Sequence, residues 1–428
     1  MRVQDGVQQW LDGLSYHTDR SLDSTTLDQA IPPLDVLTPP ASAKGHAHRE
    51  NMQTPRKRLF PDSVDDDPTP TNARAVESLV RSDDGGSPSK RSASSRQTSS
   101  VSAGSSTHGV KKLSVIRKLA SPIRYRAMHP GRSIQHSVDP LIRSLRKCAA
   151  GLETVPEIDL ACARERFPDD FNLQSIVGYG LESARAELGR PLSLDVAHMI
   201  SLEASRCTFV NEYEPGWNSS YHGIILATAT YLSKYQGEVT AANVTTARIL
   251  ARYATPSVSD AHIPGRMIDF AFCLEAEEIP ELRELLLSNA RHGFELNHTD
   301  HAPTSQRPIA ISIETKRQGV DREKGELQLE IWASAHLNRL QALVPPDLAT
   351  ELPVLPLVLV QGATWSVMFA QRHLTSTGQS TIVWKDIPLG DTLQPSGVFK
   401  VVSALLHLLD WARNVYTPWY IAALRHQH

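Results

Sequence analysis

The pattern of apolar and polar positions becomes regular near residue 138 and stays so to the C-terminus, so we place the start of the folded region at about residue 137. Helical spacing predicts helices at about residues 141–152, 173–188, 193–207, 217–233, 279–289, 326–343 and 396–416. Alternating or continuous apolar runs predict strands at 246–253, 266–274, 308–316, 355–361, 365–371 and 381–384. This order indicates an α/β domain with a mixed sheet rather than a doubly wound parallel sheet.

The expected strand at 308–316 carries the strongest chemical signal. Because side chains alternate along a strand, Ile309, Ile311 and Ile313 share one face, and Glu314 and Lys316 share the other. A carboxylate can hold a divalent cation, and an amine beside it can orient water or offset phosphate charge. The alternative is an edge strand that ends in a surface ion pair.

The expected strand at 266–274 has the same two-faced design. Phe270 and Phe272 share a bulky face, whereas Asp269 lies among small residues on the other face. If the two strands are neighbours, Asp269 and Glu314 come together on one surface. Paired carboxylates there can hold Mg²⁺ and leave positions for water and phosphate.

An amphipathic helix expected after this strand carries Gln328 and Trp332. The two are four residues apart and therefore lie on one helix face, which could contact a DNA backbone or catalytic groups. The alternative is that Trp332 is a core or rim aromatic and Gln328 is solvated.

Asp269, the Glu314–Lys316 segment and the Gln328-x-x-x-Trp332 spacing together resemble the signature of the PD-(D/E)XK nuclease superfamily. The resemblance implies a restriction-endonuclease-like mixed β-sheet flanked by helices, with an Asp on one strand and a Glu-x-Lys on the next. The wider sequence, over about residues 140–425, resembles a fungal group of PD-(D/E)XK nuclease-like domain proteins. Four segments carry that likeness: 214–222, with Trp217, Asn218 and His222; 268–270; 297–300; and 311–316.

The same resemblance implies roles for single residues. Asp269, Glu314 and the backbone carbonyl of Thr315 would bind Mg²⁺ or Mn²⁺, and Lys316 would activate water or stabilise the transition state. An acid on the preceding helix often assists, and Glu214 is the first candidate, with Glu212 second. The expected catalytic set is Asp269, Glu314, Lys316, Gln328 and Glu214. The chain departs from the superfamily pattern in having no proline directly before Asp269, and Pro215-Gly216 makes the start of the Trp217 helix unusual.

The amino-terminal region, residues 1–136, is rich in Ser and Pro and becomes basic toward its end. It has too few apolar side chains to offset the entropy of ordering, so we expect it to be disordered and the nuclease-like domain to span 137–428. Residues 81–147 hold fourteen Lys or Arg and three acids, a net charge of +11 that leaves −14 for the rest of the chain. A basic arm on an acidic body is typical of a nucleic-acid tether, and the alternative is a solvated linker.

The remaining sequence features concern compartment and metals. The four cysteines are far apart and form no Cys-x-x-Cys pair, which disfavours a disulfide framework and indicates an intracellular, reducing compartment. The clusters 56–58 and 111–112 indicate, weakly, a nuclear location. No apolar run approaches the roughly 20 residues of a membrane span. His298 and His301 are not followed by a second ligand pair, so zinc is disfavoured.

These observations favour a Mg²⁺-dependent deoxyribonuclease that hydrolyses DNA phosphodiester bonds. The alternative is a catalytically silent nuclease-fold module that binds nucleic acid or a protein partner, although a module kept only for binding has no need of all three motif residues. A third interpretation, regulation through Ser/Thr-Pro sites such as Ser87-Pro88, applies to the tail. The expected partners are nucleic acid, DNA first, and a second copy of the chain in a homodimer, with no membrane partner. DNA-sequence specificity is open because no pattern reads base edges.

Overall fold

The computed structural model describes residues 119–128, 134–256, 267–289, 295–319, 322–345, 348, 351–376 and 378–426, and all of these belong to one unit. Disorder is predicted for residues 1–136, and residues 1–118 and 129–133 of this range lie outside the described residues, as do the basic clusters at 56–58 and 111–112 and the Ser/Thr-Pro sites.

A mixed sheet forms the centre of the fold, as the sequence predicts, and it has seven strands. Its strand order is β1-β9-β8-β7-β6-β5-β4. The strands are β1 (Ile123–Ala127), β4 (Val239–Asn243), β5 (Phe270–Leu274), β6 (Ile309–Lys316), β7 (Leu355–Gln361), β8 (Thr364–Thr375) and β9 (Gly378–Asp391). The β1–β9 and β6–β7 pairs are parallel, and the other pairs are antiparallel.

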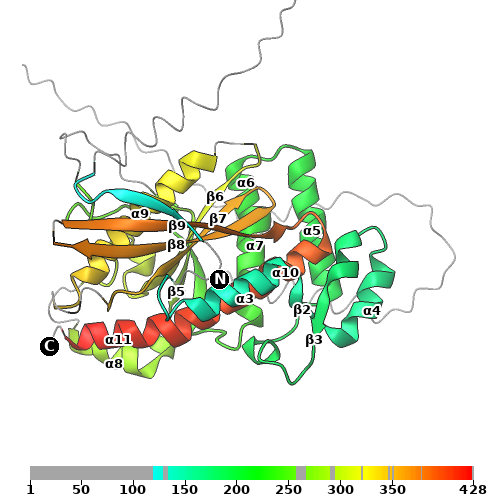
Figure 1. Ribbon diagram of the computed structural model, residues 1–428, viewed down its shortest axis with the longest axis horizontal. Helices are drawn as coiled ribbons and strands as arrows, with labels where there is room; N and C mark the ends of the chain where they lie inside the picture. Colours follow the sequence, from blue (N-terminus) through cyan, green and yellow to red (C-terminus); the bar gives the residue numbers. More distant parts are fainter. Residues whose placement is uncertain are drawn as a thin grey trace, which may run out of the picture. The chain divides into compact units, whose positions relative to one another are not determined.

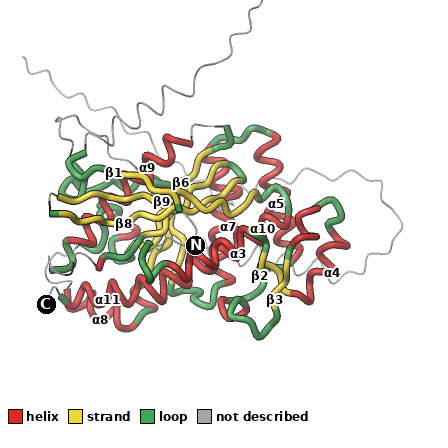
Figure 2. The backbone as a smooth tube through the Cα atoms, in the orientation of Figure 1, coloured by secondary structure: helices red, strands yellow, loops and turns green. Residues whose placement is uncertain are grey.

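Helices cover both faces of this sheet (Figure 1). The α-helices are α3 (Asp139–Ala149), α4 (Glu157–Arg166), α5 (Leu194–Phe209), α6 (Glu214–Trp217), α7 (Gly223–Leu232), α8 (Pro280–Asn289), α9 (Arg322–Gln341), α10 (Pro395–Trp411) and α11 (Thr417–Arg425). Two π-helical segments, Asn218–His222 and Ala412–Tyr416, join α6 to α7 and α10 to α11. A small parallel sheet of β2 (Leu152–Pro156) and β3 (Val177–Tyr179) lies beside α4, apart from the main sheet (Figure 2).

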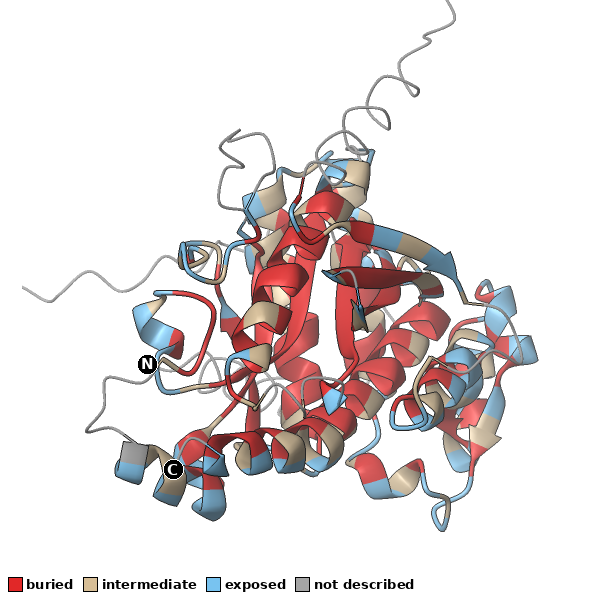
Figure 3. Cartoon of the chain, turned by 60° about the vertical axis from the view of Figure 1, so that its left-hand side comes forward, coloured by how far each residue is buried: buried red, intermediate tan, exposed pale blue. Residues whose placement is uncertain are grey.

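Strand β6 is buried on both faces, so its alternation in the sequence separates a face of large apolar side chains from a buried face of small and charged ones. On one face Trp332 of α9 donates a hydrogen bond from Nε1 to Ser312 Oγ at 3.1 Å. On the other side the hydroxyl of Tyr416 donates to the backbone carbonyl of Ile309 at 2.9 Å. Buried residues are concentrated in the central strands and in the helices packed on them (Figure 3). The strand that carries the candidate chemistry is therefore one of the most constrained elements of the fold.

The turn between β7 and β8 fixes the end of β6. Gly362 has a φ of +56°, which favours glycine. Its N–H donates to the carbonyl of Lys316 at 2.7 Å, and an added Cβ would lie 2.9 Å from Gln318 Cβ. A larger residue would push this turn away from the end of β6.

Two predicted elements are wrong, and some are missing from the prediction. Residues 246–253 form turns with one isolated bridge, Ile249 to Thr299, and the edge strand lies earlier, at β4. Residues 173–188 do not form one helix, because β3 lies between two short 3₁₀ helices, Phe171–Ser175 and Ala186–Leu188. Strand β1 precedes residue 137, so the sheet begins earlier in the chain than the apolar pattern predicts. The pattern also gave no indication of β2 or α4.

Candidate active site

Two acids meet where β5 begins and β6 ends. Asp269 lies one residue before β5, and the antiparallel pairing of Phe270 with Ile313 places it opposite Glu314. The backbone N–H and the hydroxyl of Thr315 both contact Asp269 Oδ2, at 3.0 Å and 2.8 Å. Asp269 is 8% exposed and Glu314 is fully buried, so both carboxylates are largely removed from water.

Lys316 holds the centre of the site. Its ammonium nitrogen lies 2.5 Å from Glu314 Oε1 and 3.2 Å from Glu214 Oε1. It also donates to the backbone carbonyl of Thr315 at 2.8 Å. Glu214 is the first residue of α6, and its side chain is 35% exposed, so it lies at the outer edge of the site. The structure thus brings together Asp269, Glu314, Thr315, Lys316 and Glu214.

The charges of this group do not balance, since three carboxylates face one ammonium group. Burial raises the pKa of Glu314 well above its ordinary value; the nearby Asp269 raises it further, and Lys316 opposes both effects. Burial alone would lower the pKa of Lys316, but the Glu314 carboxylate more than offsets this and the pKa is raised, so Lys316 stays charged. Glu314 Oε2 has no hydrogen-bond partner among the described residues. The group therefore has excess negative charge and an unused buried acceptor.

This donor set fits a hard divalent cation. In the described part of the chain, no three His, Cys, Asp or Glu side chains form a group that could hold a metal by themselves. A cation site here would combine the carboxylates of Asp269 and Glu314 with the Thr315 carbonyl, and oxygen ligands of these kinds suit Mg²⁺ and Mn²⁺. The cation would also offset the unbalanced negative charge.

Gln328 contacts the backbone beside the site rather than the carboxylates, and its expected catalytic role stays a prediction. Its Nε2 donates to the carbonyl of Met267 at 3.0 Å, so it holds the backbone just before Asp269. Trp332 is fully buried in the core, as the structural alternative for this residue predicts. Glu212, the second candidate for the assisting acid, pairs with Arg206 at 3.6 Å instead of Lys316.

Asn218 and His222 belong to the site although sequence reasoning gave them no role. One terminal atom of the Asn218 carboxamide lies 2.6 Å from Thr315 Oγ1 and 2.9 Å from His222 Nδ1. His222 Nε2 lies 3.0 Å from the carbonyl of Gly362. The available signal was their four-residue spacing on one helix, but their partners come from distant parts of the chain.

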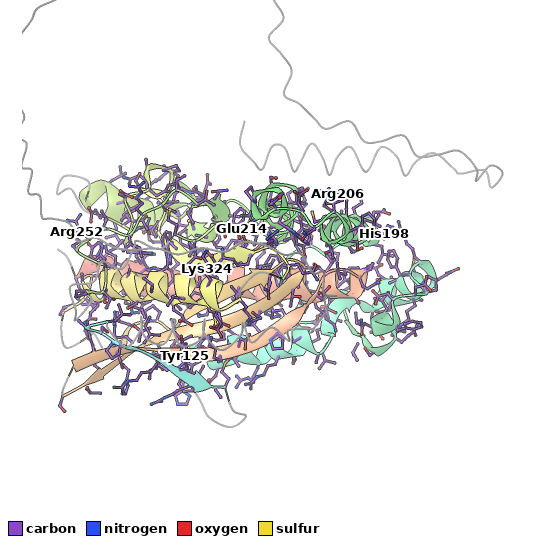
Figure 4. The ribbon with its side chains drawn as sticks, turned by 90° about the horizontal axis from the view of Figure 1, so that it is seen from above. Tyr125, His198, Arg206, Glu214, Arg252 and Lys324 are labelled. Carbon is purple, nitrogen blue, oxygen red and sulfur yellow. The ribbon has the colours of Figure 1, made fainter. Side chains whose placement is uncertain are left out.

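Two basic side chains and an exposed aromatic ring lie beside Glu214 at the outer edge of the site. Tyr213, next to Glu214, is 72% exposed, and the Arg317 guanidinium lies 5.8 Å from its ring centroid. Lys324 is exposed on α9, and an added Cβ on the neighbouring Gly325 would lie 3.1 Å from Lys316 Cγ. Figure 4 labels Glu214 and Lys324, which come from the two helices that contact Lys316. Among the described residues, neither Arg317 nor Lys324 has an acidic partner.

A surface hollow elsewhere shares no residue with this site. It is lined by Glu281, Glu284, Leu285, Ser288 and Arg425, from α8 and α11. The hollow is partly acidic, and none of its lining residues contributes to the group around Asp269 and Glu314.

The raised pKa of Glu314 predicts how stability depends on pH. The folded state binds this proton more tightly than the unfolded state, so the contribution of Glu314 is fully present below the unfolded pKa and is lost as pH rises through the folded pKa. Glu314→Gln has no such proton to lose. We expect this variant to be more stable than the wild type at pH 8, by about 1 kcal/mol or more, with the difference shrinking toward pH 4.

Urea unfolding in EDTA at several pH values measures this difference. Glu182→Gln removes an exposed carboxylate and serves as the control that should leave the pH dependence unchanged. A wild type that gains stability over Glu314→Gln as pH rises would contradict the prediction.

A comparison with protein-family models matches most of this domain. The model for the PD-(D/E)XK nuclease superfamily matches residues 163–417, a range that contains every residue of the site. No curated protein matches the chain in a sequence search.

Proposed function

The chain belongs to the PD-(D/E)XK nuclease superfamily, and we propose that it hydrolyses phosphodiester bonds in DNA with the help of Mg²⁺ or Mn²⁺. One observation carries the proposal. Asp269, Glu314, the Thr315 carbonyl and Lys316 converge in a buried group with excess negative charge. A purely structural ion pair would need neither the second buried carboxylate nor the unused acceptor on Glu314.

Each residue has a role in this proposal. Asp269, Glu314 and the Thr315 carbonyl would hold the cation, which when bound supplies a polarised phosphoryl oxygen and a more acidic water. Lys316 is charged and orients water or offsets the negative charge that develops on the reacting phosphate. Glu214, at the outer edge of the site, accepts a hydrogen bond from Lys316 and so helps to hold the ammonium group in place.

The outer edge supports a polyanionic substrate. Arg317 and Lys324 offer positive charge without acidic partners in the described part of the chain, and Tyr213 offers an exposed ring on which a base can stack. In the described residues no helix is both long and apolar enough to cross a membrane. Preference for DNA over RNA, residence in the nucleus, membership of the fungal group and a homodimeric partner remain predictions.

The direct test is cleavage of supercoiled and linear DNA by the purified protein in Mg²⁺, Mn²⁺ or EDTA. We expect cleavage with either cation and none in EDTA, and Asp269→Asn should lower the rate by about 10²-fold or more because a buried ligand loses its charge. Asp169→Asn, an exposed acid outside the site, is the matched control and should keep the wild-type rate. Equal rates for the wild type and Asp269→Asn would refute the proposal.

A silent binding module is the second candidate, and one observation favours it. The Lys316 ammonium already contacts two of the expected cation ligands, Glu314 Oε1 and the Thr315 carbonyl. A chain that binds nucleic acid without a cation would need such an internal counter-charge. Titration calorimetry with Mn²⁺ separates the two functions, because only the nuclease has a Mn²⁺ site that is lost in both Asp269→Asn and Glu314→Gln.

A further inference from the structure

A chain of polar groups leads from the turn between β7 and β8, through the π-helical segment that precedes α7, to the Asp269 carboxylate. It begins at the Gly362 carbonyl and runs through the His222 imidazole, the Asn218 carboxamide and the Thr315 hydroxyl to Asp269 Oδ2. The four steps measure 3.0, 2.9, 2.6 and 2.8 Å, all of them within hydrogen-bonding distance.

We propose that Asn218 and His222 are positioning residues for this site, which direct the Thr315 hydroxyl proton onto Asp269 Oδ2 and so keep the other oxygen of Asp269 available to a divalent cation. The proposal rests on the proposed function for the identity of that cation. The direction of the hydrogen bonds follows from the structure alone.

The direction is set at the Gly362 end. A carbonyl oxygen only accepts, so the facing Nε2 of His222 must carry a proton. The other neutral tautomer would place the Nε2 lone pair against that oxygen at 3.0 Å. His222 is fully buried and stacks on the Trp217 ring, and burial lowers its pKa to about 4, so at neutral pH it has only this one ring proton. Its Nδ1 therefore accepts a hydrogen bond.

This assignment fixes the orientation of Asn218. The two ends of a carboxamide have nearly the same shape, so hydrogen-bond partners decide which end is the nitrogen. Because His222 Nδ1 accepts a hydrogen bond, the end of the Asn218 carboxamide that faces it must be the NH₂ group. One proton of this group is then donated to His222 Nδ1 and the other to Thr315 Oγ1. The single hydroxyl proton of Thr315 is left to donate to Asp269 Oδ2. In the opposite orientation the carboxamide oxygen of Asn218 would face His222 Nδ1. Both atoms would then be acceptors, and no hydrogen bond could form between them.

The local backbone is shaped to hold this chain. Asn218 and His222 are the first and last residues of a π-helical segment. Such segments are rare in proteins, and those that occur are often found at functional sites. The next residue, Gly223, has no room for a side chain without strain, because an added Cβ would lie 3.0 Å from the Asn218 carbonyl oxygen. The turn at Gly362 connects the chain of hydrogen bonds back to β6. The Gly362 N–H donates to the Lys316 carbonyl, and the Gly362 carbonyl accepts from His222.

The chain determines which oxygen of Asp269 is free. Both hydrogen bonds described for this carboxylate, from the Thr315 N–H and hydroxyl, fall on Oδ2. Oδ1 is thereby left to a cation, and the carboxylate cannot rotate without losing both donors. Groups that orient metal ligands in this way typically change metal affinity by about 10- to 100-fold when removed.

The Asn218→Asp variant separates the proposed orientation from its opposite. It keeps the shape but replaces the NH₂ group by an acceptor oxygen, so the Thr315 proton is drawn away from Asp269 and His222 gains a second proton. We expect Mn²⁺ affinity, measured by titration calorimetry on the full chain, to fall about 10-fold or more. If the carboxamide oxygen faces the site in the wild type, the added negative charge would instead leave Mn²⁺ affinity unchanged or raise it, which would overturn the proposal.

Nitrogen NMR of His222 tests the same chain without metal or turnover. We expect a protonated Nε2 and a bare Nδ1 in the wild type at pH 7, and two protonated nitrogens in Asn218→Asp. A protonated Nδ1 in the wild type would refute the proposal. If Asn218→Asp does not fold, Thr315→Val and Thr315→Ser replace it, because only the Ser variant keeps the hydroxyl and should retain Mn²⁺ affinity. A wild type with the expected tautomer but no Mn²⁺ binding would contradict the proposed function and confirm the direction of the hydrogen bonds.

Discussion

Lys316→Met should reduce DNA cleavage by about a thousandfold, because it removes the only ammonium group that contacts the buried carboxylates of the described site. Methionine keeps most of the aliphatic stem, which packs near Gly325, so the fold should persist. Without the ammonium, the pKa of Glu314 would rise further and this ligand would tend to be protonated. Single-turnover cleavage in Mn²⁺ and a thermal unfolding curve measure the two effects separately.

Lys324→Met is the matched control for this prediction. Lys324 is exposed on α9 and makes no contact with Glu314, so its loss should weaken DNA binding at low salt and leave the cleavage rate at saturating DNA within a few-fold of the wild type. A Lys316→Met protein that is folded and cleaves at the wild-type rate would show that the ammonium group takes no part in the reaction.

Trp332→Ala should lower the free energy of unfolding by about 3–5 kcal/mol, the range found when large aromatic side chains are removed from a core. Trp332 is fully buried between α9 and β6 and packs edge to face on His298, with ring centroids 4.5 Å apart. Its Nε1 also donates a hydrogen bond to Ser312 Oγ. Because single domains are stable by only about 5–15 kcal/mol, the variant should be close to unfolding at physiological temperature. Urea unfolding at 25 °C measures the loss.

Two variants show whether this effect is one of packing. Trp332→Phe keeps a ring but loses the hydrogen bond to Ser312, and should cost about 1 kcal/mol or somewhat more, since a smaller ring also leaves space. Gln328→Ala, one turn earlier on the helix, should cost less than Trp332→Ala because Gln328 is only partly buried. A Trp332→Ala protein that keeps its stability but loses DNA cleavage would assign Trp332 a direct role in the site.

The sequence was most informative where the physical signal is local. The alternation of large apolar residues with small or charged ones in β6 extends over eight consecutive residues. Its two faces can therefore be derived without knowing any partner strand, and so can the fact that Glu314 and Lys316 share one of them. The meeting of Asp269 with Glu314 needed one further assumption, that the two strands are neighbours, and the β5–β6 pairing confirms it.

The errors lie where local pattern is weak or long-range contacts decide. Strand β1 is an edge strand with one buried residue, Ile123, so it has almost no apolar signature. The expected helix over 173–188 fails at Gly178, which lies where another backbone comes close: an added Cβ would be 2.7 Å from Glu157 Cα. The partners of His222 depend on the Gly362 turn, 140 residues away, and no local pattern announces such a contact.

The position of β1 also bears on the geometry of DNA engagement. Strand β1 lies at one edge of the sheet, four strand spacings from β6, which is about 19 Å at 4.8 Å per spacing. Strand β1 contributes Arg124 and Arg126, and the registers of β9, β8 and β7 place its first residue, Ile123, level with the start of β6, whereas Glu314 lies near the end of β6. A tether that precedes β1 would therefore join the sheet at the end opposite to the one that carries Glu314. Under the proposed function, anchoring and cutting would then occupy separate points of the DNA footprint, because both the width of four strands and most of the length of β6 lie between them.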